Sequence, residues 1–85
     1  MTERQYTIIL HPDTESGGYT VTVPALPGCV TQGESVEDAI AMARDAIRVH
    51  IDALAADGEP IPEEQSHPQA IIITVAARES ATRKR

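Results

Sequence analysis

The stretch GCVTQGES, from Gly28 to Ser35, holds the residues whose types and spacing come nearest to a chemical site. It differs from the phosphate-binding loop pattern G-x-x-x-x-G-K-[ST] at one position, because Glu34 stands where the lysine is required. That lysine contacts the β and γ phosphates of a nucleotide, whereas a carboxylate at the same position repels them. The 85 residues also leave little room for the parallel sheet of a phosphate-loop enzyme. We therefore expect no nucleotide site and interpret both glycines and the serine as structural.

Histidine and cysteine side chains are the other candidates for catalysis or metal binding. His11, His50 and His67 lie far apart in the sequence without metal-ligand spacing, and Cys29 has no base partner evident from the sequence. An enzyme that cleaves phosphodiesters with two metal ions needs several carboxylates at one place, and neither YTIILH nor AIIITVA contains one. The sequence therefore predicts no catalytic residue, no metal site and no cofactor.

Charge is distributed unevenly along the chain. Residues 1–77 hold twelve acidic and three basic side chains, whereas residues 78–85 hold four basic and one acidic. The formal net charge of −6 disfavours broad nucleic-acid binding by the folded body. We predict one domain over residues 1–77, followed by a basic, disordered tail over residues 78–85.

Composition also bounds the cellular setting and the size of the core. The single cysteine, Cys29, excludes an internal disulfide, and the N-terminus lacks the apolar run of a signal peptide or a membrane span. We therefore expect a cytoplasmic protein that does not contact a membrane. With no Phe or Trp and two tyrosines, the core must be small, and oligomerisation is a common remedy for that. The sequence predicts a homodimer or a homotetramer.

Alternating apolar residues predict three short strands in the first part of the chain, at residues 6–11, 19–23 and 29–32. Thr20 and Thr22 should face outward in the second strand, and Ile9 should face away from the core in the first. Pro27 and Gly28 suit the centre of a type II turn, because proline fixes φ and glycine supplies the positive φ. This turn should return the chain to the sheet as the third strand.

A helix of about 22 residues is the strongest secondary-structure signal. Gly33 lets the chain turn sharply out of the third strand, Ser35 is the predicted N-cap, and Asp38 follows three residues later as in a capping box. Asp57 and Gly58 supply the C-terminal stop. Apolar residues recur at spacings of three and four, at Val36, Ala39, Ile40, Ala43, Ala46, Ile47, Ile51 and Leu54.

After a proline-rich linker, the β-branched segment AIIITVA at residues 70–76 predicts a last strand. The order β-β-β-α-β belongs to the α+β class, with a single helix packed on one face of a four-stranded mixed sheet. The right-handed crossover rule lets the last strand pair in parallel beside the first. The other face should stay open and partly apolar, which makes it a candidate contact surface. The residues proposed to contact a partner or a second copy are Ile9, Ile72, Thr20, Thr22, Asp45 and Asp52.

The motifs of this sequence resemble those of one known family. The stretch VPALPGCVTQGES, followed by VEDA, resembles the strand, turn and helix start of the HicB antitoxin family, and the downstream GEPIP fits the same pattern. The resemblance spans roughly residues 6 to 64 and implies a partial ribonuclease H-like fold. It also implies a partner, because members of this family typically bind and block HicA, a small, usually basic toxin that cleaves RNA.

The leading hypothesis is a non-enzymatic antitoxin that neutralises a HicA-like toxin by direct protein–protein binding. The alternative is a stand-alone, self-associating scaffold of the same fold, with weak nucleic-acid binding through the basic tail. Many members of the family carry a C-terminal DNA-binding domain, but only RESATRKR follows Ala77, so operator binding is not expected. A small basic reading frame beside the gene would favour the antitoxin.

Overall fold

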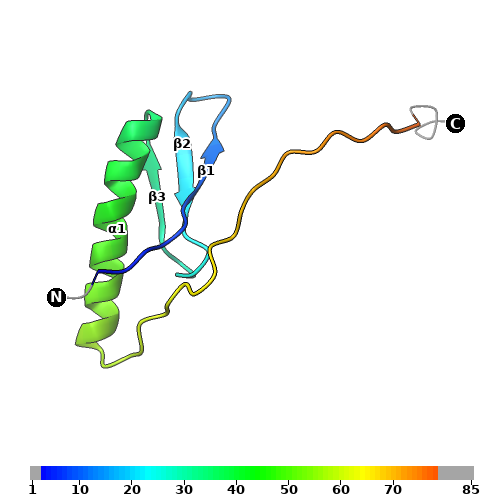
Figure 1. Ribbon diagram of the computed structural model, residues 1–85. Coiled ribbons are helices and arrows are strands. Elements are labelled where there is room, and N and C mark those ends of the chain that lie inside the picture. The colour runs from blue at the N-terminus through cyan, green and yellow to red at the C-terminus, as the bar shows by residue number, and fades with distance from the viewer. Residues whose placement is uncertain (1–2, 79–85) are drawn as a thin grey trace, which may run out of the picture.

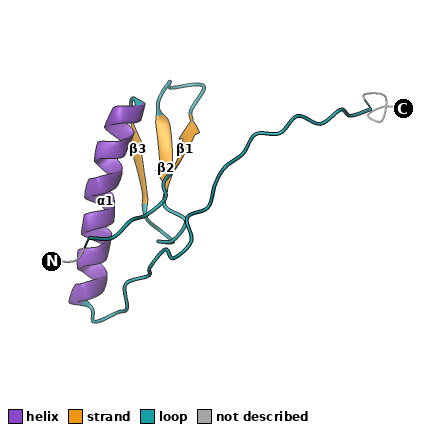
Figure 2. Ribbon diagram, viewed as in Figure 1, coloured by secondary structure: helices purple, strands orange, loops and turns teal. Residues whose placement is uncertain are grey.

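Three short strands and one helix form the regular structure of residues 3–78, the part of the chain that this computed structural model describes (Figure 1). The elements are β1 Ile9–Pro12, β2 Tyr19–Thr22, β3 Val30–Gly33 and α1 Val36–Ala56. The strands form an antiparallel sheet in the order β1-β2-β3, and α1 lies along one face of it (Figure 2). The α+β class and the order of the first four predicted elements are confirmed.

The central strand, β2, supplies the middle of the core. Val21 is fully buried, and Val23, just beyond the strand, is 4% exposed. Leu10 of β1 and Ile8, which lies just before β1, pack against the cluster around Val21. These contacts confirm the faces predicted from alternation. Pro24 has no N–H to donate to a ladder, which is why the strand ends before it.

The turn between β2 and β3 is formed by Pro27 and Gly28. The backbone N–H of Cys29 donates to the carbonyl of Leu26 at 3.0 Å, and Gly28 has a φ of +88°. A residue with a Cβ rarely adopts this φ, whereas glycine does so without strain. The positive φ predicted for Gly28 is confirmed. The turn returns Leu26 and Cys29 to the core, where both are buried.

The ends of α1 are capped as the sequence predicts. The side chain of Ser35 accepts the N–H of Asp38 at 3.0 Å, and the carboxylate of Asp38 accepts the N–H of Glu34 at 2.9 Å. The second bond is displaced by one residue from a capping box, which would use the N–H of Ser35 itself. At the other end, Gly58 has a φ of +71° and donates its N–H to the carbonyl of Ala55 at 3.1 Å. A left-handed glycine is the usual helix stop.

Gly33 allows α1 to lie directly against β3. A Cβ at this position would stand 2.4 Å from the Cα of Ala39 and 2.5 Å from its backbone nitrogen. The φ of Gly33 is not in the left-handed region, so the glycine is required for this close approach rather than for the sharp turn that the sequence suggested. Ala39 and Ala43 are both buried and continue the close contact along the helix.

The predicted fourth strand is not formed within residues 3–78. Residues 60–78 contain neither helix nor strand, and the sheet is a three-stranded antiparallel one instead of a four-stranded mixed one (Figure 2). Residues 70–78, orange in Figure 1, run away from the sheet in an extended conformation. The radius of gyration is accordingly 17.6 Å, against about 12 Å for a compact domain of this length. The β-branched composition indicated an extended segment, but it did not specify which edge the segment pairs with.

Most of the predicted basic tail, from residue 79 to residue 85, lies outside the described residues. Its disorder and the domain boundary at residue 77 therefore stay predictions. Within residues 3–78, no helix combines the length and the apolar character that crossing a membrane requires.

Candidate functional site

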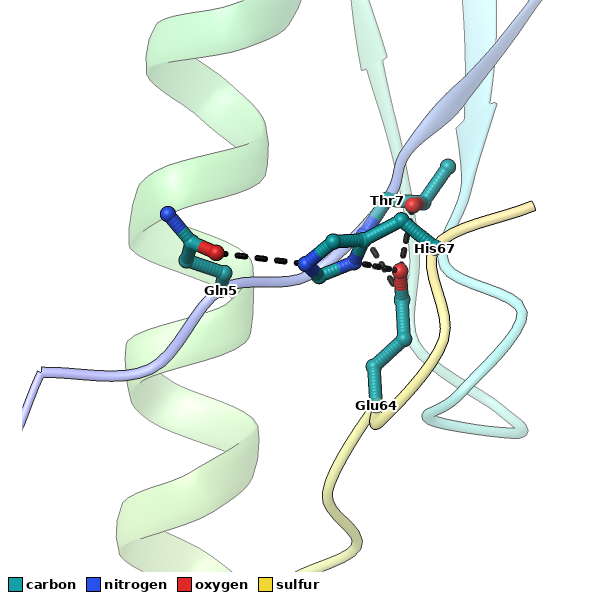
Figure 3. Close-up of polar contacts among 4 residues, drawn as sticks. All are labelled: Gln5, Thr7, Glu64 and His67. Carbon is teal, nitrogen blue, oxygen red and sulfur yellow. Dashed lines mark hydrogen bonds and ion pairs between the residues drawn. The ribbon is translucent and has the colours of Figure 1, made fainter. Parts of the chain in front are cut away.

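Residues 60–67 return from the end of α1 and dock beside the segment that leads into β1. The hydroxyl of Tyr6 donates to the carbonyl of Pro62 at 2.6 Å, and the backbone N–H of Thr7 donates to Oε1 of Glu64 at 2.8 Å. The hydroxyl of Thr7 donates to the other carboxylate oxygen, Oε2. Figure 3 shows Glu64 on the returning segment pointing toward Thr7, on the segment that leads into β1. These bonds fix the place from which the chain leaves the sheet.

Glu64 is the centre of this cluster, and its side chain is only 6% exposed. Nδ1 of His67 contacts Oε2 of Glu64, and Nε2 of His67 lies 3.2 Å from Oε1 of Gln5 (Figure 3). The hydrogen bonds from Thr7 and then from His67 lower the pKa of Glu64 from 4.5 to about 2, because donors favour the charged carboxylate. Glu64 is therefore ionised at neutral pH and anchors residues 60–67 electrostatically.

The geometry of the Glu64 cluster suits an anchor better than a catalytic site. A histidine paired with a carboxylate acts as a general base when its second ring nitrogen faces a nucleophile. Here that nitrogen faces Gln5, and the hydroxyl of Thr7 is held by Glu64. Cys29 lies in the core, where burial raises the pKa of its thiol and disfavours the reactive thiolate. The described residues also contain no cluster of three or more potential metal ligands.

The segment Ala70–Ala76, called the arm below, presents apolar side chains to solvent. Ile72 is 99% exposed, and the three other large side chains of the arm, Ile71, Ile73 and Val75, are each more than two-thirds exposed. Among the described residues, no backbone-to-backbone hydrogen bond joins residues 60–78 to the sheet. A contiguous apolar surface of this kind marks a contact surface.

The face of the sheet opposite α1 is also uncovered, and the strand register aligns its side chains in rows. Ile9 lies opposite Thr22, which lies opposite Val30, so that these three residues form one row across the sheet. Thr20 belongs to the next row, between His11 and Gln32. Ile9 is 39% exposed and Val30 is 57% exposed. The row Ile9–Thr22–Val30, called the open-face row below, is thus an apolar stripe with a polar centre.

The six residues predicted to form one contact surface are divided among three places. Ile9, Thr20 and Thr22 share the open face of the sheet, as predicted. Ile72 was expected beside Ile9 on this face, but it lies on the arm instead. Asp45 and Asp52 are exposed on α1, which lies on the opposite side of the sheet. No single partner-facing patch contains all six.

A hollow of about 810 Å³ lies between the β1–β2 loop and the start of α1, and three carboxylates line it. Asp13 accepts the N–H groups of Glu15 and Ser16, and the hydroxyl of Ser16 is the largest cause that lowers its pKa. Glu34 and Asp38 line the other side, where Asp38 caps the helix. The carboxylates of Asp13 and Asp38 stabilise local backbone turns, and together with Glu34 they make this end of the molecule negative.

Two parts of the site were missed by sequence analysis. Val30 belongs to the open-face row, and the alternation of residues 29–32 places it outward, so this signal was present. Glu64 and His67 are three residues apart in a proline-rich linker, and nothing local shows that the linker docks on Thr7. The docking depends on a hydrogen bond between two residues that are 57 positions apart in the sequence. Sequence periodicity carries no information about such distant contacts.

Comparison with known protein families gives a match over most of the chain. Residues 6–79 match the family described as the HicB-like antitoxin of bacterial toxin–antitoxin systems. A UPF0150 protein of Thermoplasma acidophilum is 44% identical over 62 residues, which cover 73% of this chain and 88% of that protein. The antitoxin HicB of Escherichia coli K12 is 40% identical over 58 residues, which cover 68% of this chain and 41% of that protein.

A solved structure shares the fold as well as the sequence. The crystal structure of the N-terminal domain of Burkholderia pseudomallei antitoxin HicB superposes with a TM-score of 0.61 at 39% sequence identity. The match covers 72% of this chain and 71% of that chain. The similarity therefore extends over most of this chain as a folded unit, rather than over a short motif.

Proposed function

This chain belongs to the HicB-like antitoxin family of bacterial toxin–antitoxin systems, and we propose that it neutralises a small, basic, HicA-like toxin by binding it directly. The observation that carries this proposal is the match of residues 6–79 to that family. We define this toxin by its chemistry, as a cation-rich protein that binds RNA when the antitoxin does not cover it.

Charge supports the proposal on the kinetic side. Residues 1–77 hold twelve acidic side chains against three basic ones, and the hollow lined by Asp13, Glu34 and Asp38 concentrates part of that charge. A negative body attracts a basic toxin over long range and repels the RNA that competes for the same surface. Exposed charge pairs contribute only about 0 to 1 kcal/mol each, so the charge speeds the encounter more than it holds the complex.

Apolar contact must supply the lasting affinity, and the open-face row provides a surface for it. Ile9 and Val30 are exposed on the sheet face that α1 does not cover, with Thr22 between them. The outer side of α1 is less suitable, because acidic and basic residues alternate there and Asp45 already lies 3.5 Å from Arg48. We therefore place the toxin on the open face of the sheet.

The proposed mechanism is occlusion without chemistry. Cys29 and His50 line one hollow of about 400 Å³, but the thiol is buried and burial raises its pKa, which disfavours the reactive thiolate. The ring of His67 is held between Glu64 and Gln5. Covering the toxin's RNA-binding surface requires only a stable interface, so the antitoxin needs no catalytic group. The amount of toxin neutralised should then match the amount of toxin bound in the complex.

The test is co-expression of this chain with the small basic protein encoded beside it. We expect rescue of growth and a complex that survives gel filtration at low salt. Val30→Lys should weaken rescue because it places a cation in the open-face row, whereas Asp52→Lys should preserve rescue. Both positions are exposed, so circular dichroism should show the same fold for both variants. Absence of both rescue and complex with the wild-type chain would contradict the proposal.

A second candidate function is a self-associating scaffold without a toxin. The exposed arm favours it, because an uncharged apolar segment suits a second copy better than a basic partner. A stable oligomer that binds no neighbouring gene product would support this alternative.

A further inference from the structure

The arm has the composition of a sheet strand but lacks a strand to pair with. Ile71, Ile73 and Val75 fall on one side of an extended chain, and Ile72 and Thr74 fall on the other. β-branched residues favour strands because they pack well on a pleated surface. In the described part of the chain, the arm's backbone groups form no ladder with another segment. The arm is therefore an unused strand.

The outer edge of β1 is an unused pairing site. β1 pairs with β2 on one side, with Leu10 opposite Val21 and His11 opposite Thr20. On its other side, no described residue forms a backbone hydrogen bond with β1. Pro12 lacks an N–H, so pairing must use the part of the edge before it. An unprotected edge of this kind readily accepts an extended chain.

A groove beside this edge fits the apolar side of the arm. The groove has a volume of about 510 Å³ and runs between α1 and the residues that lead into β1. Ile8, Ile40, Ala43 and Ile47 form its apolar part, and Ile40 is 37% exposed. Arg4, Arg44 and His67 also line the groove. It exists because α1 packs on β3 and β2 and leaves the β1 side of the sheet uncovered. A strand added to β1 would insert every second side chain into this groove.

The arm does not occupy the groove of its own chain in this structure. Glu64 and His67 hold the chain beside Thr7 and Gln5, and the segment beyond them leads away from the sheet (Figure 1). Pro68 restricts His67 to an extended conformation and so maintains this direction. Each copy therefore has one free arm and a free β1 edge with the groove beside it.

We propose that the arm, Ala70–Ala76, is donated as a strand to the β1 edge of a second copy, whose own arm is donated in return. In a reciprocal exchange about a twofold axis, each arm pairs with the β1 edge of the other copy through the same contact. The assembly is then complete as a dimer. Residues 69–77 carry no charged side chain, so the arm offers no charge to a cation-rich partner and suits the apolar part of the groove of an identical chain. This inference is independent of the toxin.

The first experiment locates the arm in the full-length protein without any partner. A mixed sample, half isotope-labelled and half unlabelled, is examined by filtered nuclear Overhauser spectroscopy. We expect contacts between arm amides of labelled copies and residues 5–11 of unlabelled copies. We also expect amide exchange in residues 70–76 to be slowed about 100-fold or more relative to a free peptide. Contacts only within one copy, or exchange at free-peptide rates, would overturn the proposal.

The second experiment tests the backbone pairing with matched variants at one fully exposed position. Ile72→Pro removes an N–H from the donated strand, whereas Ile72→Thr retains both the N–H and β-branching. Sedimentation should show a dimer for the wild type at tens of micromolar, and Ile72→Pro should raise the dissociation constant about tenfold or more. Ile72→Thr should change it about threefold at most. A wild-type monomer, or a dimer that Ile72→Pro leaves intact, would refute the exchange.

Discussion

Glu64 accepts the backbone N–H of Thr7 at 2.8 Å, and this contact between residues 57 positions apart fastens the returning chain to the lead-in of β1. The same carboxylate receives the hydroxyl of Thr7 and the ring of His67. Up to residue 78, the chain beyond this anchor forms no backbone hydrogen bond with the sheet, so the Glu64 contact fixes where the chain leaves the domain.

Acid should release this anchor. The pKa of Glu64 is lowered from 4.5 to about 2 in the folded protein, so its ionised form stabilises the docked segment above pH 4.5. That stability falls as the pH drops from 4.5 toward 2, because the carboxylate becomes protonated. Thermal unfolding followed by circular dichroism should show a decrease in melting temperature across this window.

The matched comparison for this prediction is Glu64→Gln against Glu63→Gln. Glu64→Gln should lower the melting temperature at pH 7 and flatten its dependence on pH below 4.5. Glu63 is mostly exposed and lies 3.9 Å from Arg4, so Glu63→Gln should change little. Equal effects of the two variants would show that Glu64 is not the anchor.

Loss of the helix cap should destabilise the whole domain. Ser35→Ala removes the acceptor of the Asp38 N–H at the start of α1 and should cost about 0.5 to 2 kcal/mol of unfolding free energy. Urea denaturation measures this cost. Ser66→Ala, at an exposed position in the linker, is the control and should change the unfolding free energy by less than about 0.5 kcal/mol.

The contact of Gly33 with Ala39 should not tolerate even a methyl group. Gly33→Ala places a Cβ 2.4 Å from the Cα of Ala39 and should cost about 1 to 3 kcal/mol, since β3 or α1 must move. The nearest atoms are backbone, so adding Ala39→Gly should not restore stability. Recovery in the double variant would show that the Ala39 methyl alone limits the packing.

Local signals in the sequence were sufficient for the elements and their ends. Ser35, Gly28 and Gly58 perform the capping and turning that their types predict, because those interactions are made within a few residues. The position of AIIITVA was not predictable in the same way. A strand needs an edge, and the β1 edge of the same chain and that of another copy are chemically identical. Periodicity identifies the strand but not the edge, and the anchor that directs the chain is a contact between distant segments.

The purified protein should hydrolyse neither nucleotides nor RNA. Glu34 opposes phosphate at the only phosphate-loop-like stretch, and the carboxylates near it cap backbone N–H groups instead of converging on a metal ion. Assays with ATP and with RNA, each in the presence of magnesium, should give no turnover above a buffer blank. Saturable activity that disappears in Asp38→Ala, while the fold persists, would contradict this.

Salt should slow formation of the toxin complex more than it speeds its decay. Long-range attraction by the acidic body is screened beyond about 8 Å at 0.15 M salt, so the association rate constant should fall about tenfold between 0.05 and 0.5 M salt.

Asp45→Lys and Asp52→Lys should lower this association rate constant a few-fold and leave the dissociation rate constant nearly unchanged, because both side chains are exposed on α1. Val30→Lys should instead raise the dissociation rate constant about tenfold, equivalent to about 1.4 kcal/mol, because it disrupts the open-face row. Surface plasmon resonance with the immobilised toxin separates the two rate constants. If the aspartate variants accelerated dissociation while Val30→Lys did not, the toxin would sit on the helix and not on the open face of the sheet.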